Sequence, residues 1–120
     1  MANEITITTS LSTTKNGATV SSGTKTSSHD MSGDQAIGNI QIIGTSWEAI
    51  VLGDVTTIGF VRALNLDATN YVELALANDS TGVFTKLKAG EAALFRASTA
   101  TMYARANTAA CNVHFVAVED

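Results

Sequence analysis

The feature that most limits which folds this chain can adopt is an alternation of apolar and polar residues with a period of two. Turn residues break the alternation at short intervals. From Ile58 onward, apolar side chains recur at every second position, and Gly, Asn and Asp separate the stretches. Successive side chains of a β-strand point to opposite faces, so the pattern is typical of half-buried strands. No segment shows the 3.6-residue period of a helix. The sequence therefore predicts an all-β fold with few helices.

The N-terminal segment alternates in the same way but carries little apolar bulk. Ile5, Ile7 and Leu11 share one face of a strand expected over residues 3–12. Asn16-Gly17 predicts a type I′ hairpin turn, because both central positions of that turn need positive φ. The returning strand, expected over residues 18–27, is rich in Ser and Thr and offers little to cover the apolar stripe. Residues 1–28 could form either a mobile arm or a hairpin at a sheet edge, and Ile5, Ile7 and Leu11 are candidate contacts to a partner.

The rest of the chain predicts a series of short strands at regular spacing. The apolar run from Ala49 to Leu52 indicates a central strand buried on both faces. Val72, Leu74 and Leu76 are expected to point inward from one strand. After residue 38 the expected strands cover residues 40–43, 46–52, 58–66, 71–77, 83–88, 91–97, 101–106 and 112–119. About ten antiparallel strands are typical of a single β-sandwich or barrel, and 120 residues suit one domain over residues 1–120.

The amino-acid composition indicates which classes of partner the protein can bind. Charged residues make up only 15% and hydrophobic residues 45%, with a mean hydropathy of +0.17. A small monomer cannot bury that much apolar surface, so subunit contacts are expected. The alternative explanation is that Ala and Thr, which are tolerated on surfaces, raise the hydropathy. The net charge is −4 and no Lys/Arg cluster occurs, which argues against nucleic acid. No apolar run spans a membrane and the start lacks signal-peptide character, so no membrane and assembly in a cytoplasm are expected.

Catalytic and metal-binding constellations are not expected. His29, Asp30 and Asp34 lie near one another in the sequence but match no metal-binding loop. His114, on a strand face with two valines, is expected to be hydrogen-bonded rather than ligating. Cys111, the single cysteine, shares a strand face with apolar residues and is expected to be a small buried hydrophobe. We therefore predict neither a cofactor nor an enzymatic activity.

Three arginines lie on expected strands among apolar neighbours: Arg62, Arg96 and Arg105. One interpretation is ordinary exposure on the polar face of a sandwich. The other is pairing at a subunit interface with a carboxylate such as Glu73 or Glu91, of the same or another subunit, because guanidinium suits bidentate pairing at interfaces. The sequence leaves both open.

Four segments of the chain resemble small virion structural proteins of tailed bacteriophages. These are residues 65–74 (NLDATNYVEL), 86–91 (KLKAGE) and 103–109 (YARANTA), with the ending VED at 118–120. The resemblance covers about half of the chain and leaves out the Ser/Thr-rich N-terminal segment. It implies a jelly-roll-like β-sandwich, a homotrimer, and a structural role as a capsid decoration (cement) protein or a fibre-like piece.

The combined expectation is a cement protein that stabilises the head shell of a phage. Its partners would be itself, as a homotrimer, and the phage major capsid protein, and it would be found in the virion after assembly in the host cytoplasm. Two alternatives stay open: a tail or fibre component, and a carbohydrate-binding adhesin module. Trp47 could serve the adhesin as a sugar platform, although its place before an apolar run predicts a core position.

Overall fold

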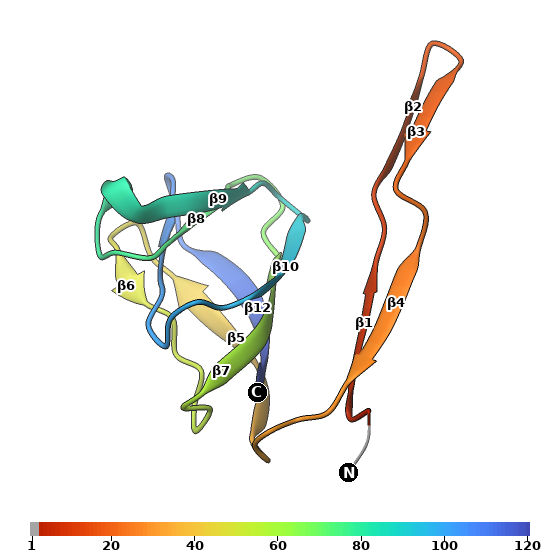
Figure 1. Cartoon of the computed structure of the whole chain (residues 1–120). Coiled ribbons are helices and arrows are strands. Elements are labelled where there is room, and N and C mark those ends of the chain that lie inside the picture. Colours follow the sequence, from red (N-terminus) through yellow and green to blue (C-terminus); the bar gives the residue numbers. More distant parts are fainter. Residues whose placement is uncertain (1–2) are drawn as a thin grey trace. The chain divides into compact units, whose positions relative to one another are not determined.

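The computed structural model describes residues 3–120, and the chain divides into two compact units, residues 1–32 and 33–120 (Figure 1). All strand pairs among the described residues are antiparallel, and the only helical element there is one 3-10 turn. The all-β prediction is therefore confirmed. The N-terminal unit has β1 (Ile5–Thr9), β2 (Ser12–Lys15), β3 (Ala18–Ser21) and β4 (Lys25–His29). The C-terminal unit has β5 (Ala36–Ile43), β6 (Glu48–Ala49), β7 (Ile58–Asn65), β8 (Val72–Ala75), η1 (Ser80–Gly82), β9 (Val83–Leu87), β10 (Ala92–Arg96), β11 (Tyr103–Ala106) and β12 (Cys111–Glu119).

The N-terminal unit is one long hairpin in which β1 pairs with β4 and β2 pairs with β3. Its turn is the predicted one: Asn16 has φ 54° and Gly17 has φ 78°. The register changes once, between the pair Thr9–Lys25 and the pair Leu11–Ser22, whose backbone groups are joined by a 2.8 Å hydrogen bond. Two residues on the returning side therefore face the single Ser10, which is a β-bulge. Gly23, at φ 69°, supplies the left-handed conformation there.

The bulge decides which side chains share a face of the hairpin. A one-residue shift of register moves every later side chain to the opposite face. Val20, directly opposite Thr13, thus comes to the same face as Ile5, Ile7 and Leu11. The opposite face carries hydroxyl groups, and Thr8–Thr26 and Thr14–Thr19 meet there at 3.3 and 3.0 Å.

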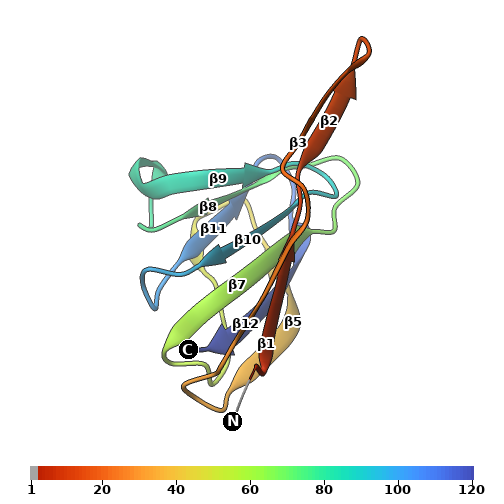
Figure 2. The ribbon, with the colours of Figure 1, turned by 45° about the vertical axis from the view of Figure 1, so that its right-hand side comes forward.

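The C-terminal unit contains two four-stranded sheets, in the orders β10-β7-β12-β5 and β6-β11-β8-β9 (Figures 1 and 2). The pairing is nested: β5 lies beside β12, β6 beside β11, β7 beside β10, and β8 beside β9. The unit is therefore a long hairpin of four strand pairs, folded so that alternate pairs enter different sheets.

Both sheets contribute to one hydrophobic core. Phe115 and Ile43, from the first sheet, and Leu74, from the second, are fully buried. The inward face of β7 carries small residues, including Val61 and Ala63, while its larger side chains point outward. The buried alternate residues of β12 match the predicted apolar face of that strand: Cys111, Val113, Phe115 and Ala117.

Two sequence-based expectations about burial are wrong. Val72 and Leu74 point inward as predicted, but Leu76 is 49% exposed. A register shift between Leu74 and Ala75 reverses the alternation, so Ala75 is buried instead. No periodicity in this segment marks the bulge, because Ala and Leu can each occupy either face.

The predicted central strand over residues 46–52 is also wrong. Only Glu48–Ala49 is a strand, at the edge of its sheet, and Val51 is 57% exposed. The Gln41 side chain satisfies the backbone here, accepting from the Val51 N–H at 2.9 Å and donating to the Ala49 carbonyl at 3.0 Å. The run is apolar because Leu52 anchors it in the core, not because a strand is covered on both faces.

No helix among residues 3–120 has the length and apolar character needed to cross a membrane.

Candidate functional site

A polar row crosses the outer side of the β6-β11-β8-β9 sheet. Arg105 lies directly opposite Glu73, and Glu73 lies opposite Lys86. Arg105 Nη2 donates to Glu73 Oε1 at 2.8 Å, with the two side chains 35% and 19% exposed. This ion pair is formed within one chain, so one of the predicted arginine–glutamate pairings exists without a second subunit. A role for it at a subunit interface stays a prediction.

Aromatic rings extend the row at both ends. The Arg105 guanidinium lies over the Trp47 ring at 4.6 Å, and the Lys86 ammonium lies over the Tyr71 ring at 4.6 Å. Both distances are within the range of cation–π attraction. Trp47 is half-buried and is not part of the core, so the expectation of a core tryptophan is wrong. The backbone puts it outside because it precedes the short edge strand β6, where it extends the row beside Arg105.

The other predicted pairing residues are not brought together. Arg96 pairs with Asp120 at 2.6 Å and stacks over Phe60 at 4.3 Å. Glu91 accepts from the Lys88 N–H at 2.8 Å and closes the turn before β10. Arg62 is exposed, and within the described part of the chain no ion pair reaches it.

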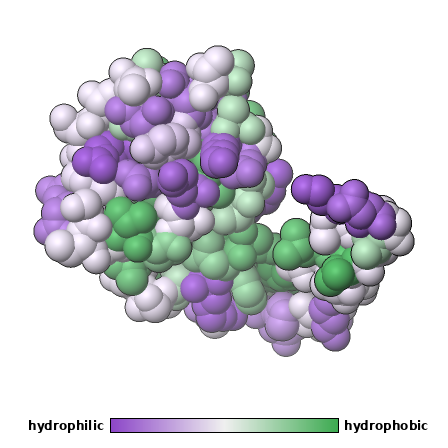
Figure 3. All heavy atoms as spheres, turned by 90° about the horizontal axis from the view of Figure 1, so that it is seen from above, coloured by the Kyte–Doolittle hydropathy of each residue, from purple (hydrophilic) through white to green (hydrophobic). Residues whose placement is uncertain are grey.

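The outward side of the β10-β7-β12-β5 sheet carries several apolar side chains among its polar ones, although a water-facing side of an antiparallel sheet is normally polar. Ile40 and Ile42 are 59% and 67% exposed on edge strand β5. His114 lies between Ile40 and Leu64, and Arg62 lies between Val116 and Leu94. We call this surface the outer face and define it by its apolar members: Ile40, Ile42, Leu64, Leu94, Val116 and Val118. Apolar residues also reach the surface of the molecule in the space-filling view (Figure 3).

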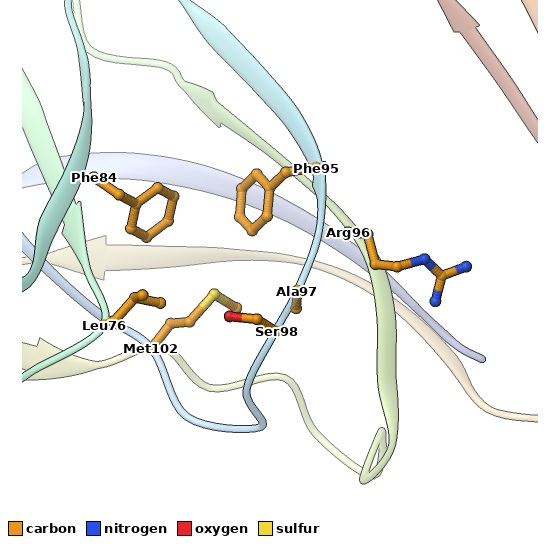
Figure 4. Close-up of a pocket in the computed structure, with 7 residues that line it drawn as sticks. All are labelled: Leu76, Phe84, Phe95, Arg96, Ala97, Ser98 and Met102. Atoms are coloured by element: carbon orange, nitrogen blue, oxygen red, sulfur yellow. The ribbon is translucent and has the colours of Figure 1, made fainter.

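A pocket of about 250 Å³ opens between β9 and β10, the edge strands of the two sheets (Figure 4). Phe84 and Phe95 meet edge to face there, with ring centroids 5.4 Å apart. Met102 is almost fully buried, whereas Leu76 and Phe84 are 49% and 42% exposed. The lining is apolar apart from one hydroxyl and one guanidinium, and comprises Leu76, Phe84, Phe95, Arg96, Ala97, Ser98 and Met102. This chemistry suits an apolar side chain.

A shallow apolar groove lies on the hairpin. Leu11 and Val20 line it and are 80% and 69% exposed. Of the other two predicted contact residues, Ile7 is partly exposed and Ile5 is buried. The stripe of Ile5, Ile7 and Leu11 could be predicted from the sequence. Val20 could not, because only the bulge brings it to the same face.

A buried polar residue that the sequence did not single out joins two turns, the one between β7 and β8 and the one between β9 and β10. Asn65 is fully buried at the end of β7. Its amide donates to the carbonyls of Asn70 and Leu87 at 2.9 and 3.0 Å and its oxygen accepts from the Asp67 N–H at 3.0 Å. Its backbone also bonds to Glu91 and Gly90. The sequence signal was its place on the inward face of an alternating strand, next to a turn.

Asp67 organises the turn that follows. Its carboxylate accepts from the backbone N–H groups of Asn70 at 2.7 Å and Thr69 at 3.0 Å. These two donors, the Asn70 N–H first, lower the pKa of Asp67. The arrangement is structural: it sets the turn between the two sheets.

Cys111 and the histidines show no catalytic arrangement. Cys111 is fully buried, as predicted, and its pKa is raised by burial and then by the charge of Asp67. His114 lies on the outer face, on the opposite side of β12 from Cys111. His29 is 3.0 Å from the Ser27 hydroxyl, and Asp30 accepts from the Asn3 N–H at 2.6 Å. Within residues 3–120 no group of three or more His, Cys, Asp or Glu side chains could hold a metal ion.

Comparison with known proteins adds no relative: no family model, no curated protein and no solved structure matches the chain.

Proposed function

We propose that the chain is a structural protein of a tailed-bacteriophage virion, and specifically a decoration protein that binds the outside of the head shell. The resemblance of residues 65–74, 86–91 and 103–109 to such proteins motivates this class. The proposal includes self-association as a homotrimer and attachment to the major capsid protein.

The nested strand order supports a jelly-roll classification of the C-terminal unit. A jelly roll is a double sheet of eight strands built from two Greek keys. Among strands β5 to β12 the first pairs with the last, the second with the second-to-last, and so on. Successive pairs belong alternately to the two sheets. We propose that this unit is a jelly-roll sandwich, the architecture that the resemblance implies.

The observation that carries the proposal is the outer face. Ile40 and Ile42 are more than half exposed on this sheet. Exposed apolar surface is unfavourable in water, and burying it in a contact contributes about 25 cal/mol for each Å². Exposed apolar side chains gathered on one face are typical of interaction sites on folded proteins. A decoration protein needs such a surface, because its function is to add buried area across junctions between capsid subunits.

The mechanism we propose is stabilisation by binding. A ligand that binds the assembled shell, and not its separated subunits, raises the free energy of disassembly as its concentration exceeds its dissociation constant. An oligomer that grips several capsid subunits gains effective concentration at each further contact. Of the predicted stripe of Ile5, Ile7 and Leu11, Ile5 is buried, so the partly exposed Ile7 is the candidate attachment to the shell.

The decisive experiment compares phage heads with and without the protein. Heads that carry it should survive heating or chelation to a higher temperature or chelator concentration than stripped heads, and adding purified protein back should restore the difference. Ile7→Ser should weaken binding to heads while the C-terminal unit stays folded; Thr8→Ser, on the opposite hairpin face, is the matched control. Equal resistance of both kinds of head, with labelled antibody found only at the tail, would replace decoration by a tail role.

A glycan-binding role is the second candidate, and the partly exposed Trp47 is the observation that favours it. The Arg105 guanidinium already lies over this ring, which leaves less of it for a sugar. Titration of host surface glycans against the single tryptophan's fluorescence tests the role. A saturable fluorescence change, together with binding heat in calorimetry that Trp47→Ala abolishes, would favour the adhesin.

A further inference from the structure

The strands of the N-terminal hairpin do not bury all of the apolar side chains that they carry. Two-stranded hairpins are marginally stable in water and need a third strand or a packed face. Leu11 and Val20 lie side by side in the hairpin groove and are 80% and 69% exposed. These two exposed apolar side chains therefore favour a partner surface that covers them.

Charge indicates what kind of surface that is. Residues 9–25 of the hairpin contain Lys15 and Lys25 and no acidic residue. Residues 33–120 contain nine Asp or Glu and five Lys or Arg, so the whole net charge of −4 resides in the C-terminal unit. A basic hairpin end and an acidic unit attract each other, and two copies of the chain supply both.

The pocket between β9 and β10 suits the Leu11 side chain in size and in chemistry. Its volume is about 250 Å³ and its wall is formed by Phe84, Phe95 and Met102 (Figure 4). A dry apolar cavity of ~150 Å³ holds a benzene molecule, so the four-carbon leucine side chain fits. Asp79 lies in the loop between the pocket residues Leu76 and Phe84. Its carboxylate is held ionised by hydrogen bonds from Thr81, the hydroxyl first and then the N–H, which lower its pKa.

We propose that Leu11, with Val20 beside it, inserts into the pocket between β9 and β10 of a second copy of this chain. The two surfaces differ, so the contact is heterologous and repeats from copy to copy; it gives a ring, such as the proposed trimer, where the rotation between copies closes. The inference deepens the proposed homo-oligomer, on which it rests, by naming the contact that builds it.

Paired cysteine variants test the contact directly. In a Cys111→Ala background, one chain carries Leu11→Cys and a second, with a different tag, carries Ser98→Cys at the pocket. Mild oxidation of the mixture should give a disulfide-linked species that contains both tags. Thr14→Cys, on the hydroxyl face of the hairpin, is the matched control and should give far less of it. Ile42→Cys, on the outer face, is a competing target for Leu11→Cys.

Each result decides the question. A two-tag species with Ser98→Cys above both controls supports the proposal. Preferential linkage to Ile42→Cys, no linkage above Thr14→Cys, or closure only within one chain in a Leu11→Cys/Ser98→Cys double variant would overturn it.

Dissociation measurements separate this contact from the proposed assembly itself. Leu11→Ser should raise the dissociation constant of the oligomer about tenfold to a hundredfold, the equivalent of burying one leucine side chain, whereas Thr14→Ser should leave it unchanged. An oligomer that persists unchanged with Leu11→Ser rejects the contact and keeps the assembly. A wild-type mass of one chain by light scattering at micromolar concentration rejects both.

Discussion

The side-chain amide of Asn65 donates to the main-chain carbonyl of Leu87 at 3.0 Å inside the core. Asn65 belongs to β7 of one sheet and Leu87 to β9 of the other, so this bond joins the two sheets directly. A buried amide is tolerated only where its donors and acceptor are satisfied, and each of them has a partner here. The same residue holds the turn before β8 and the turn before β10.

Asn65→Ala should lower the free energy of unfolding by about 2–3 kcal/mol, because it leaves buried backbone groups without partners. Denaturant unfolding followed by circular dichroism measures the loss. Asn112→Ala changes an exposed asparagine and should stay within about 0.5 kcal/mol of the wild type. Equal effects of the two substitutions would contradict the role given to Asn65.

Asp67→Asn should destabilise the protein at neutral pH and lose that effect in acid. The pKa of Asp67 is lower in the folded than in the unfolded state, so its charge stabilises the fold fully above the unfolded value of about 3.9. That stabilisation is lost as the pH falls through the folded-state pKa. Urea unfolding at pH 7 and at about pH 3 should therefore show a gap between wild type and variant that narrows in acid. A gap that does not change with pH, or an equal one for the exposed Asp54→Asn, would contradict this account.

Cys111 should react slowly with a thiol reagent in the native protein and rapidly after denaturation, because it is fully buried and its pKa is raised. Cys111→Ser should cost about 1–3 kcal/mol if the new hydroxyl finds no partner. Cys111→Ala removes the sulfur without adding a polar group, so the difference between the two variants isolates the cost of the hydroxyl. Native labelling as fast as denatured labelling would show that the thiol is accessible.

Arg105 and Glu73 should couple weakly in a double-mutant cycle. For a partly exposed pair of this kind we expect about 0.5 kcal/mol from Arg105→Gln, Glu73→Gln and the double variant. Arg105→Gln should also change the fluorescence of Trp47, the only tryptophan, because the guanidinium lies over its ring. Arg62→Gln, at an exposed arginine outside this sheet, should leave the spectrum unchanged. A coupling near zero together with an unchanged spectrum would mean that the row is not formed in solution.

Local patterns in the sequence determined the class of fold and much of its detail. The period of two identified strands, because alternation is a local property of extended backbone. Asn16-Gly17 specified its turn, because few other residue pairs readily take positive φ at both central positions. The apolar face of β12, with Cys111 in the core, followed from the same alternation.

Tertiary structure decided whatever depends on register and on pairing between distant strands. The bulges at Gly23 and at Leu74–Ala75 reverse faces, so Val20 joins Leu11 and Leu76 turns outward. Arg105 meets Glu73 rather than Glu91 because β11 pairs with β8, a choice that no local pattern encodes. The apolar outer face and the pocket between β9 and β10 arise in the same way. Each gathers residues that are far apart in the sequence, and only the nested pairing of strands brings them onto one surface.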